Sequence, residues 1–368
     1  YETYFTSAQL LNYGFGKPIF ALFRDVGIGE VGNYSWFSYG TIFEFLAMGK
    51  PIIHYRDDGL YNENEIYPMY DAANEEQIYE ALRNCFINTA EAKKKGELAH
   101  VWFINSAIKT VSIVKRFDVV VGFGGYVAAS AYLAAAILRK PIVIHDQNAK
   151  IGLANKFGAI FTKEIAVAYP NSGLSGARVV GNPLKREIVK AATQSDWLAA
   201  RASAKAALGV SGELVLILGG SSGSVAVNKV ISETNFGDRT VIHSVGKTNE
   251  LPEGSATYRP VAYIEDMATV LLAADLVISR SGAIACSEFA ALGKYALFIP
   301  LPIGNGEQAL NADELVAAHK AEVLPQSQFT SAWLSQNIER LIKQGSVEPL
   351  GTSLNAAEQI SDCIGRVL

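Results

Sequence analysis

Residues 279–294 read Ser-Arg-Ser-Gly-Ala-Ile-Ala-Cys-Ser-Glu-Phe-Ala-Ala-Leu-Gly-Lys and lie between two apolar runs, 274–278 and 295–300. The runs have the length of buried strands, so we predict a strand, a tight Ser-Gly turn, a short helix that stops at Gly293, and a second strand. Such a turn directs unpaired N–H groups of the helix N-terminus beyond the strand end, which favours anion binding. Glu288 lies too far into the helix to cap it and can reach the hydroxyls of a ribose there. A surface glutamate on an ordinary crossover helix would have the same pattern.

Apolar runs of strand length recur from residue 116 onwards, and most gaps between them carry a helix-like segment that follows Gly or Ser. These runs are Asp118–Val121, Pro141–His145, Glu164–Tyr169, Glu213–Leu218, Val241–Ser244, Val261–Ile264, Asp275–Ser279 and Tyr295–Leu301. Continuous Val/Ile/Leu runs indicate strands that are buried on both faces. We therefore predict an α/β fold with two doubly wound, Rossmann-like parallel sheets that face a cleft, joined near the turn Gly181-Asn182-Pro183.

The composition of the 368-residue chain excludes several functional classes. A net charge of −4 and a pI of about 5.8 give no basic footprint for nucleic acid. The three cysteines are widely spaced, which favours a reducing cytoplasm, and neither they nor the five histidines have metal-ligand spacing. We therefore expect no metal and no cofactor. The longest apolar run, Tyr126–Leu138, is too short to span a bilayer.

A glycine-rich turn, Gly219–Ser224, follows one predicted strand and opens a helix. Its glycines let the backbone approach a phosphate, and the helix N-terminus adds partial positive charge. No lysine follows at the position that a Walker A loop requires. A tight strand-to-helix turn without a ligand is the alternative.

Polar groups also follow two other predicted strands. His145-Asp146-Gln147-Asn148 ends the run that begins at Pro141, and Gly304–Gln308 follows the run that begins at Tyr295. Amide and carboxylate groups at strand ends suit sugar hydroxyls, and His145 or Asp146 could act as a base by position. The alternative is a pair of polar loops in which His145 bonds backbone carbonyls.

The segment Gly122–Val127 invites a dinucleotide interpretation, with Asp146 as the acid for a ribose. The third glycine position of that fingerprint is Val127, which opposes close helix–strand packing. A nicotinamide enzyme therefore ranks below a sugar-nucleotide enzyme.

Residues 1–115 have a different character and contain a second copy of the helix-Gly-Lys-strand unit. Setting Glu44 on Glu288, an offset of 288 − 44 = 244, also aligns the Glu-Phe and Gly-Lys pairs of the two segments. Any helix packed on a parallel strand has a similar pattern, but the shared pairs favour a true repeat.

Eight motifs occur in a specific order: Val119–Val127 (VVVGFGGYV), His145–Ala149 (HDQNA), Gly152–Asn155 (GLAN), Gly181–Lys185 (GNPLK), Gly219–Ser221 (GGS), Arg280–Ala283 (RSGA), Pro300–Gln308 (PLPIGNGEQ) and Asn311-Ala312. As a set they resemble the MurG family, transferases that move N-acetylglucosamine from UDP onto lipid I to make lipid II. The resemblance covers about residues 116–368, and the motif at Pro300–Gln308 resembles the actinobacterial branch. It implies a GT-B-like fold.

The resemblance also implies a division of the chain and a set of site residues. Residues 1–115 resemble the C-terminal half of a different, group 1 glycosyltransferase, 116–184 the rest of the acceptor-side domain, 185–350 the UDP-sugar domain, and 351–368 a C-terminal helix. The implied donor-binding residues are Asn148, Lys185, Gly220, Ser221, Ile264, Ala283, Ile284, Ala285, Cys286, Ser287, Glu288 and Gln308. Gly124, Gly125 and Tyr126 would face the acceptor, and His145 and Asp146 are the candidate catalytic residues.

The chain departs from the family pattern at three places. Lys185 stands where the family usually has Arg, and Asp146 stands where it usually has Glu. Lysine keeps the charge but loses the bidentate fork of arginine. The glycine-rich loop Gly-Gly-Thr-x-Gly-His, which helps the family bind the acceptor pyrophosphate, does not occur in this sequence. The chain, which opens on Tyr1, thus resembles a fusion of two glycosyltransferase pieces.

The resemblance implies an inverting, metal-independent glycosyltransferase that uses UDP-N-acetylglucosamine and a lipid-linked muramyl-peptide acceptor. The alternative is a folded but catalytically silent sugar-nucleotide-binding hybrid, because the acceptor loop is missing. A cytoplasmic protein that is peripheral on the inner face of the cell membrane, with no nucleic-acid partner, is also implied.

Overall fold

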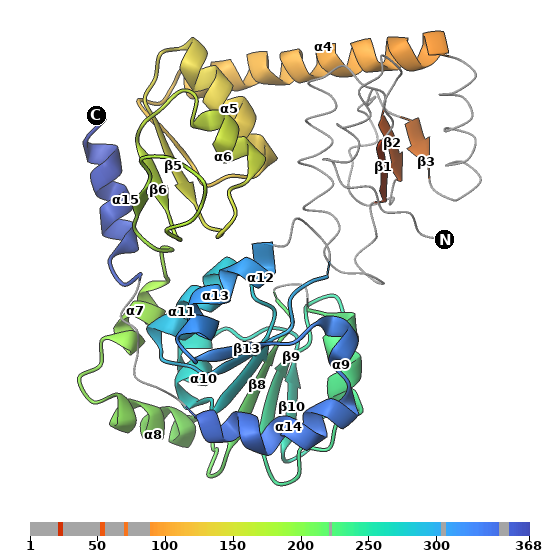
Figure 1. Ribbon diagram of the computed structural model, residues 1–368, viewed down its shortest axis with the longest axis vertical. Coiled ribbons are helices and arrows are strands. Elements are labelled where there is room, and N and C mark those ends of the chain that lie inside the picture. The colour runs from red at the N-terminus through yellow and green to blue at the C-terminus, as the bar shows by residue number, and fades with distance from the viewer. Residues whose placement is uncertain are drawn as a thin grey trace. The chain divides into compact units, whose positions relative to one another are not determined.

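The computed structural model describes residues 21–24, 52–55, 70–72, 89–220, 223–302, 307–345 and 353–368. The chain divides into two compact units, one formed by residues 1–120 with 124–141 and the other by residues 121–123 with 142–368. The strands form three sheets (Figure 1). All strand pairs with a described register run in parallel, as the continuous apolar runs predict.

The described residues of the first unit include a small parallel sheet and the helices α4 (Thr89–Val114) and α5 (Tyr126–Ile137). The sheet has the order β1 (Ala21–Arg24), β2 (Ile52–Tyr55), β3 (Tyr70–Ala72). Helices α4 and α5 contact one another. Of the repeated unit predicted at residues 40–55, only its strand, β2, falls within the described residues.

The four-stranded sheet follows in the chain. Its order is β4 (Val120–Gly122), β5 (Ile142–Asp146), β6 (Ile165–Val167), β7 (Arg178–Val179), with α6 (Leu153–Gly158) after β5. The last helix, α15 (Ala356–Gly365), returns to β5 and β6 (Figure 1). It buries Ile360 and Cys363, and Arg366 after it pairs with Glu164 at 3.0 Å.

The six-stranded sheet forms the core of the second unit. Its order is β10 (Tyr258–Val261), β9 (Thr240–Ser244), β8 (Leu214–Leu218), β11 (Leu276–Ser279), β12 (Ala296–Phe298), β13 (Ala321–Val323). The chain starts at β8 in the middle, moves outward to β10, and then returns to β11 on the other side of β8. This is the doubly wound order that the sequence predicts.

Helices cover both faces of this sheet (Figure 1). They are α7 (Arg186–Ala192), α8 (Trp197–Ala207), α9 (Val225–Ser232), α10 (Met267–Ala273), α11 (Ala283–Ala291), α12 (Glu307–Asn311), α13 (Asp313–Ala317) and α14 (Ser331–Gln344), with a 3-10 turn at Gln326–Gln328. Neighbouring residues of one strand enter opposite clusters: Leu216 packs with residues of α10 and α11, and Ile217 packs with residues of α9 and α14. Burial on both faces explains why the strands lack an alternating pattern.

One predicted strand was misplaced, and four of the described strands, β1, β3, β7 and β13, were not predicted. The run Val261–Ile264 is mostly a loop, because β10 ends at Val261. Ile264, which follows the strand, still packs its side chain into the core. The short strands β7 and β13 lack a continuous apolar run; β13 reads Ala-Glu-Val and β7 reads Arg-Val. A two- or three-residue strand is specified by its neighbours rather than by its own sequence.

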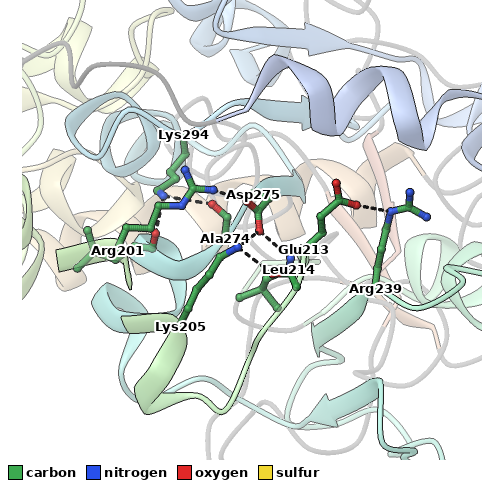
Figure 2. A network of polar contacts seen from close by, with 10 residues as sticks. Arg201, Lys205, Glu213, Leu214, Arg239, Ala274, Asp275 and Lys294 are labelled. Carbon is green, nitrogen blue, oxygen red and sulfur yellow. Dashed lines mark hydrogen bonds and ion pairs between the residues drawn. The ribbon is translucent and has the colours of Figure 1, made fainter. Parts of the chain in front are cut away.

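A charged network ties α8 to the start of β11 (Figure 2). The Asp275 carboxylate accepts hydrogen bonds from Arg201, from Lys205 at 2.6 Å and from the Leu214 N–H at 2.7 Å. The buried Lys294 Nζ donates to the carbonyls of Leu272 (2.8 Å) and Ala274 (3.2 Å). Burial and the charge of Arg201 lower the pKa of Lys294 to about 7; Asp275 opposes the shift and Lys205 adds to it.

This network predicts a pH-dependent stability. Above pH 7 the unfolded chain, whose lysines titrate near pH 10.4, binds more protons at Lys294 than the folded protein does, so folding becomes more favourable as the pH rises from 7 towards 10. Lys294→Met removes this titration. The Tm of the wild type minus that of Lys294→Met should therefore grow by several degrees between pH 6 and pH 9, one pKa unit corresponding to about 1.4 kcal/mol.

The matched control is Lys343→Met, because Lys343 is exposed on α14. Its Tm difference from the wild type should stay constant over the same pH range. A constant difference for Lys294→Met as well would contradict a depressed pKa at this position.

Candidate nucleotide site at the ends of β8 and β11

The two turns that the sequence singles out lie at the ends of neighbouring strands. Leu218, the last residue of β8, is in register with Ser279, the last residue of β11. The chain leaves β8 towards β9 and leaves β11 towards β12, on opposite sides. This is the switch point of a doubly wound sheet, where ligands bind beyond the carboxyl ends of the strands. The strand order thus brings the two predicted phosphate-binding turns together.

The turn after β8 has a backbone that only glycine accommodates. Gly220 and Gly223 have φ values of 93° and 75°. A Cβ atom on Gly223 would lie 1.9 Å from the Val245 carbonyl oxygen at the end of β9. Ser224 then caps α9, its Oγ accepting the Val227 N–H at 3.4 Å. The predicted phosphate ligand Ser221 lies outside the described residues.

The turn after β11 leaves the N-terminus of α11 open. Gly282 is its N-cap residue and provides no side chain to cap the helix. Its φ is −66°, and a Cβ atom built there meets no other atom of the described residues within 4 Å. Ser281 beside it is fully buried, and its Oγ has no hydrogen-bond partner among the described residues. The first N–H groups of α11 are therefore available to an anion.

Arg280 joins both turns to the rest of the sheet, a role that the sequence did not predict. Its guanidinium donates to Ser224 Oγ (2.7 Å) and Gln326 Oε1 (2.6 Å), and to the carbonyls of Ile299 (2.8 Å) and Pro300 (3.2 Å). All four partners are neutral, so no carboxylate among the described residues cancels the positive charge by direct contact. Burial lowers the pKa of Arg280 to about 10, which keeps it charged at neutral pH.

The predicted donor-binding residues of α11 divide into two sets. Ala283, Cys286 and Ser287 are buried in packing, whereas Ile284, Ala285 and Glu288 are partly exposed. Burial raises the pKa of the Glu288 carboxyl, and the positive charge of Lys185 opposes that shift. Burial also raises the pKa of the Cys286 thiol. Glu288 and Lys185, predicted as separate donor contacts, therefore lie within electrostatic range of each other.

The predicted catalytic pair lies at the end of β5. His145 Nε2 donates to the Gly181 carbonyl at 2.8 Å, and the buried Nδ1 has no partner among the described residues. Burial lowers the pKa of His145, although the Gly181 hydrogen bond and the Asp146 charge oppose this. Asp146 closes the following loop by accepting N–H groups from Asn148 (3.0 Å), Gly152 (3.0 Å) and Asn155 (2.9 Å).

Two buried asparagines join the loop after β5 to the turn after β11. Asn182 Nδ2 donates to the Gln147 carbonyl (3.1 Å) and to Ser287 Oγ (3.0 Å). Asn311 Oδ1 accepts the Ala149 N–H (2.8 Å), and its Nδ2 donates to the Ser281 carbonyl (3.3 Å). The sequence contained both residues in motifs but gave no signal of these contacts, two of which, Asn182 to Ser287 and Asn311 to Ala149, join residues more than a hundred positions apart.

The remaining predicted residues lie elsewhere. Gln308 Oε1 accepts the Leu301 N–H at 3.0 Å, while residues 303–306 of its loop lie outside the described part. Gly124 and Gly125, with φ values of 86° and 76°, precede α5 in the first unit; α5 begins at Tyr126, whose side chain is not described. Across the described residues, no group of three or more His, Cys, Asp and Glu side chains could hold a metal ion.

Comparison with known proteins identifies the family. The model of the glycosyltransferase family 28 C-terminal domain matches residues 214–365, and that of the N-terminal domain matches residues 75–167. A relative from Corynebacterium diphtheriae is 39% identical over 272 residues, which cover 70% of this chain and 74% of that protein. The chain belongs to glycosyltransferase family 28.

Two relatives from different bacteria have the same name. The protein from Corynebacterium diphtheriae and one from Streptomyces coelicolor are each called a UDP-N-acetylglucosamine--N-acetylmuramyl-(pentapeptide) pyrophosphoryl-undecaprenol N-acetylglucosamine transferase. The Streptomyces relative is 41% identical over 234 residues, which cover 61% of this chain; the chain spans 63% of that relative's length. The crystal structure of Acinetobacter baumannii MurG has the same fold, with a TM-score of 0.56, 23% identity, and coverage of 95% of this chain and 100% of that one.

One added methyl group should lower the free energy of unfolding by different amounts at the two turns. Gly223→Ala would force a positive φ on alanine and a contact with the Val245 carbonyl, so it should lower the free energy of unfolding by about 2 kcal/mol or more. Gly282→Ala meets open space at an ordinary φ and should cost less than about 1 kcal/mol. Urea unfolding of both variants measures this difference; equal losses would contradict it.

Proposed function

We propose that the chain transfers N-acetylglucosamine from UDP-N-acetylglucosamine to a lipid-linked muramyl-peptide, the reaction that its relatives' names describe. The observation that carries this proposal is the pair of glycine-containing turns at the ends of the neighbouring strands β8 and β11, in a chain of family 28. Phosphates would rest on the N-termini of α9 and α11. Glu288 and Lys185 would then read the ribose and the diphosphate, with Ile264 near the base.

The chemical demand of this reaction is charge stabilisation on the departing UDP. Two helix N-termini and the uncancelled charge of Arg280 converge on the turns, and such preorganised dipoles and charges are most effective where water is excluded. They need no reorganisation when the bond breaks. We infer an inverting single displacement in which the acceptor hydroxyl attacks the anomeric carbon as UDP leaves.

A base must take the proton of the attacking hydroxyl, and the geometry favours His145 over Asp146. With its Nε2–H bonded to the Gly181 carbonyl, a neutral His145 carries its lone pair on Nδ1. The lowered pKa of His145 keeps the ring neutral at physiological pH. Both oxygens of Asp146 already accept N–H groups. The ring centroid of Phe123 lies 5.6 Å from that of His145.

An exposed apolar surface supports peripheral binding to the membrane that carries such an acceptor. Leu153, Phe157, Ile160 and Phe161 on and after α6 are 58%, 36%, 74% and 40% exposed. The exposed lysines 150, 156 and 163 alternate with them along the chain. Apolar side chains among lysines suit an anionic bilayer surface. Among the described residues no helix is long and apolar enough to cross a membrane.

The donor site is tested by titration calorimetry with UDP and UDP-N-acetylglucosamine. Gly282→Ala should unfold like the wild type, because the methyl group meets no protein atom, yet it should weaken UDP binding by tenfold or more, because that space is where a phosphate would lie. Unchanged UDP affinity in a folded Gly282→Ala variant would contradict this site.

Transfer itself is tested with a lipid I analogue and labelled donor. The intact chain should form labelled lipid-linked product, and His145→Gln should reduce kcat by at least about a hundredfold while UDP affinity is kept. Donor binding without any transfer by the intact chain would instead favour a catalytically silent sugar-nucleotide-binding protein.

Membrane binding is tested by co-sedimentation with vesicles that contain anionic lipid. Ile160→Glu should weaken binding by about tenfold or more, because it removes an exposed apolar side chain that would insert into the bilayer and adds a charge that anionic lipid repels. Leu198→Glu is the matched control, since Leu198 is 61% exposed on α8, away from α6 in the chain. Equal binding by both variants would contradict this surface.

A further inference from the structure

The side chain of Asn311 has a fixed orientation, although it is an amide whose two ends have the same shape. It is 1% exposed, and its two ends meet backbone groups of opposite kind. The Ala149 N–H can only donate, so it faces Asn311 Oδ1 at 2.8 Å. The Ser281 carbonyl can only accept, so it faces Asn311 Nδ2 at 3.3 Å. A flipped amide would place two donors together at Ala149 and two acceptors together at Ser281.

This orientation determines that of Asn148 as well. Asn311 Nδ2 also lies 3.3 Å from the Asn148 side chain, and a donor there requires the carbonyl end, Oδ1, of Asn148. The Asn148 amide nitrogen therefore points away from Asn311. The Asn148 backbone N–H is held separately by Asp146 Oδ1 at 3.0 Å, so both the main chain and the side chain of this half-buried residue are constrained.

We propose that Asn311 is a positioning residue that makes Asn148 present its N–H donors, and not its carbonyl, to the sugar of the bound donor. This inference rests on the proposed function. It assigns a polarity to the subsite: Asn148 would read an oxygen atom that accepts a hydrogen bond, such as a hexose hydroxyl or acetamido oxygen. Because Asn311 also holds the Ser281 carbonyl of the phosphate-binding turn, one buried amide links the sugar-reading and phosphate-binding parts of the site.

The test separates the sugar from the nucleotide. The measured quantity is the ratio of the Kd for UDP to that for UDP-N-acetylglucosamine, which isolates the contribution of the sugar. Asn311→Asp keeps the shape and the acceptor for Ala149 but cannot donate to Asn148, whose amide is then free to flip. This ratio should fall by about tenfold, the effect of one hydrogen bond. UDP affinity is measured separately, because Asn311→Asp also loses the hydrogen bond to the Ser281 carbonyl of the phosphate-binding turn.

A double-mutant cycle distinguishes positioning from general loosening of the loop. Asn148→Ala alone should lower the same ratio by about tenfold, and adding Asn311→Asp should lower it little further. Asn182→Ala is the control, because Asn182 is also buried and joins the same loop to α11 through Gln147 and Ser287 without a bond to Asn148. Asn182→Ala should lower Tm. Any effect that it has on the Kd ratio should add to that of Asn148→Ala.

The outcomes are distinct. No UDP binding by the wild type would refute the proposed function. Normal UDP binding with an unchanged ratio in Asn148→Ala, or additive losses for Asn148→Ala and Asn311→Asp, would overturn the positioning role alone. Since Asn148 is half-buried, the Kd ratio of Asn148→Ala remains measurable even when Asn311→Asp fails to fold.

Discussion

The buried guanidinium of Arg280 is the interaction on which the site depends. A charge removed from water is costly unless it is well hydrogen-bonded, and here neutral oxygens from three separate segments satisfy most of its donors. One of them is the residue that caps α9, so the charge, the cap and the turn after β11 form a single unit. The Nε–H is buried without a partner among the described residues. An arginine held by carbonyls and hydroxyls, rather than by a carboxylate, keeps its attraction for an anion.

Around Arg280, hydrogen bonds of buried polar side chains also fix the positions of the neighbouring loops. Short polar side chains with fixed donors and acceptors connect segments that are distant in sequence: Asn182 and Asn311 join the end of β5 to the start of α11, and Asp146 closes the loop between them. Each buried amide must satisfy groups of defined polarity, so each contact permits one arrangement only. Apolar packing would tolerate small shifts of these loops, whereas this network does not.

Much of the fold could be predicted from local sequence, because strands buried on both faces are continuous apolar runs and parallel strands require helical crossovers. The strand–turn–helix unit at Ser279–Lys294 is confirmed: β11 ends at Ser279, α11 spans Ala283–Ala291, and Gly293 has the positive φ of a helix stop. What local sequence lacked was strand order and long-range partners. The sequence placed His145 and Asp146 at a strand end, but their hydrogen bonds to Gly181 and to Asn155 depend on how separate segments meet. The roles of the donor and acceptor residues remain predictions.

The return of α15 to β5 and β6 has a consequence for how the protein is made. The six-stranded sheet is built from one continuous stretch, residues 214–323, and can assemble as soon as that stretch leaves the ribosome. The four-stranded sheet precedes it in the chain, yet its cover arrives last, with Ile360 and Cys363. The four-stranded sheet is therefore synthesised before the six-stranded sheet but completed after it. Until the segment that forms α15 has been made, β5 and β6 lack the apolar side chains of Ile360 and Cys363 that pack against them.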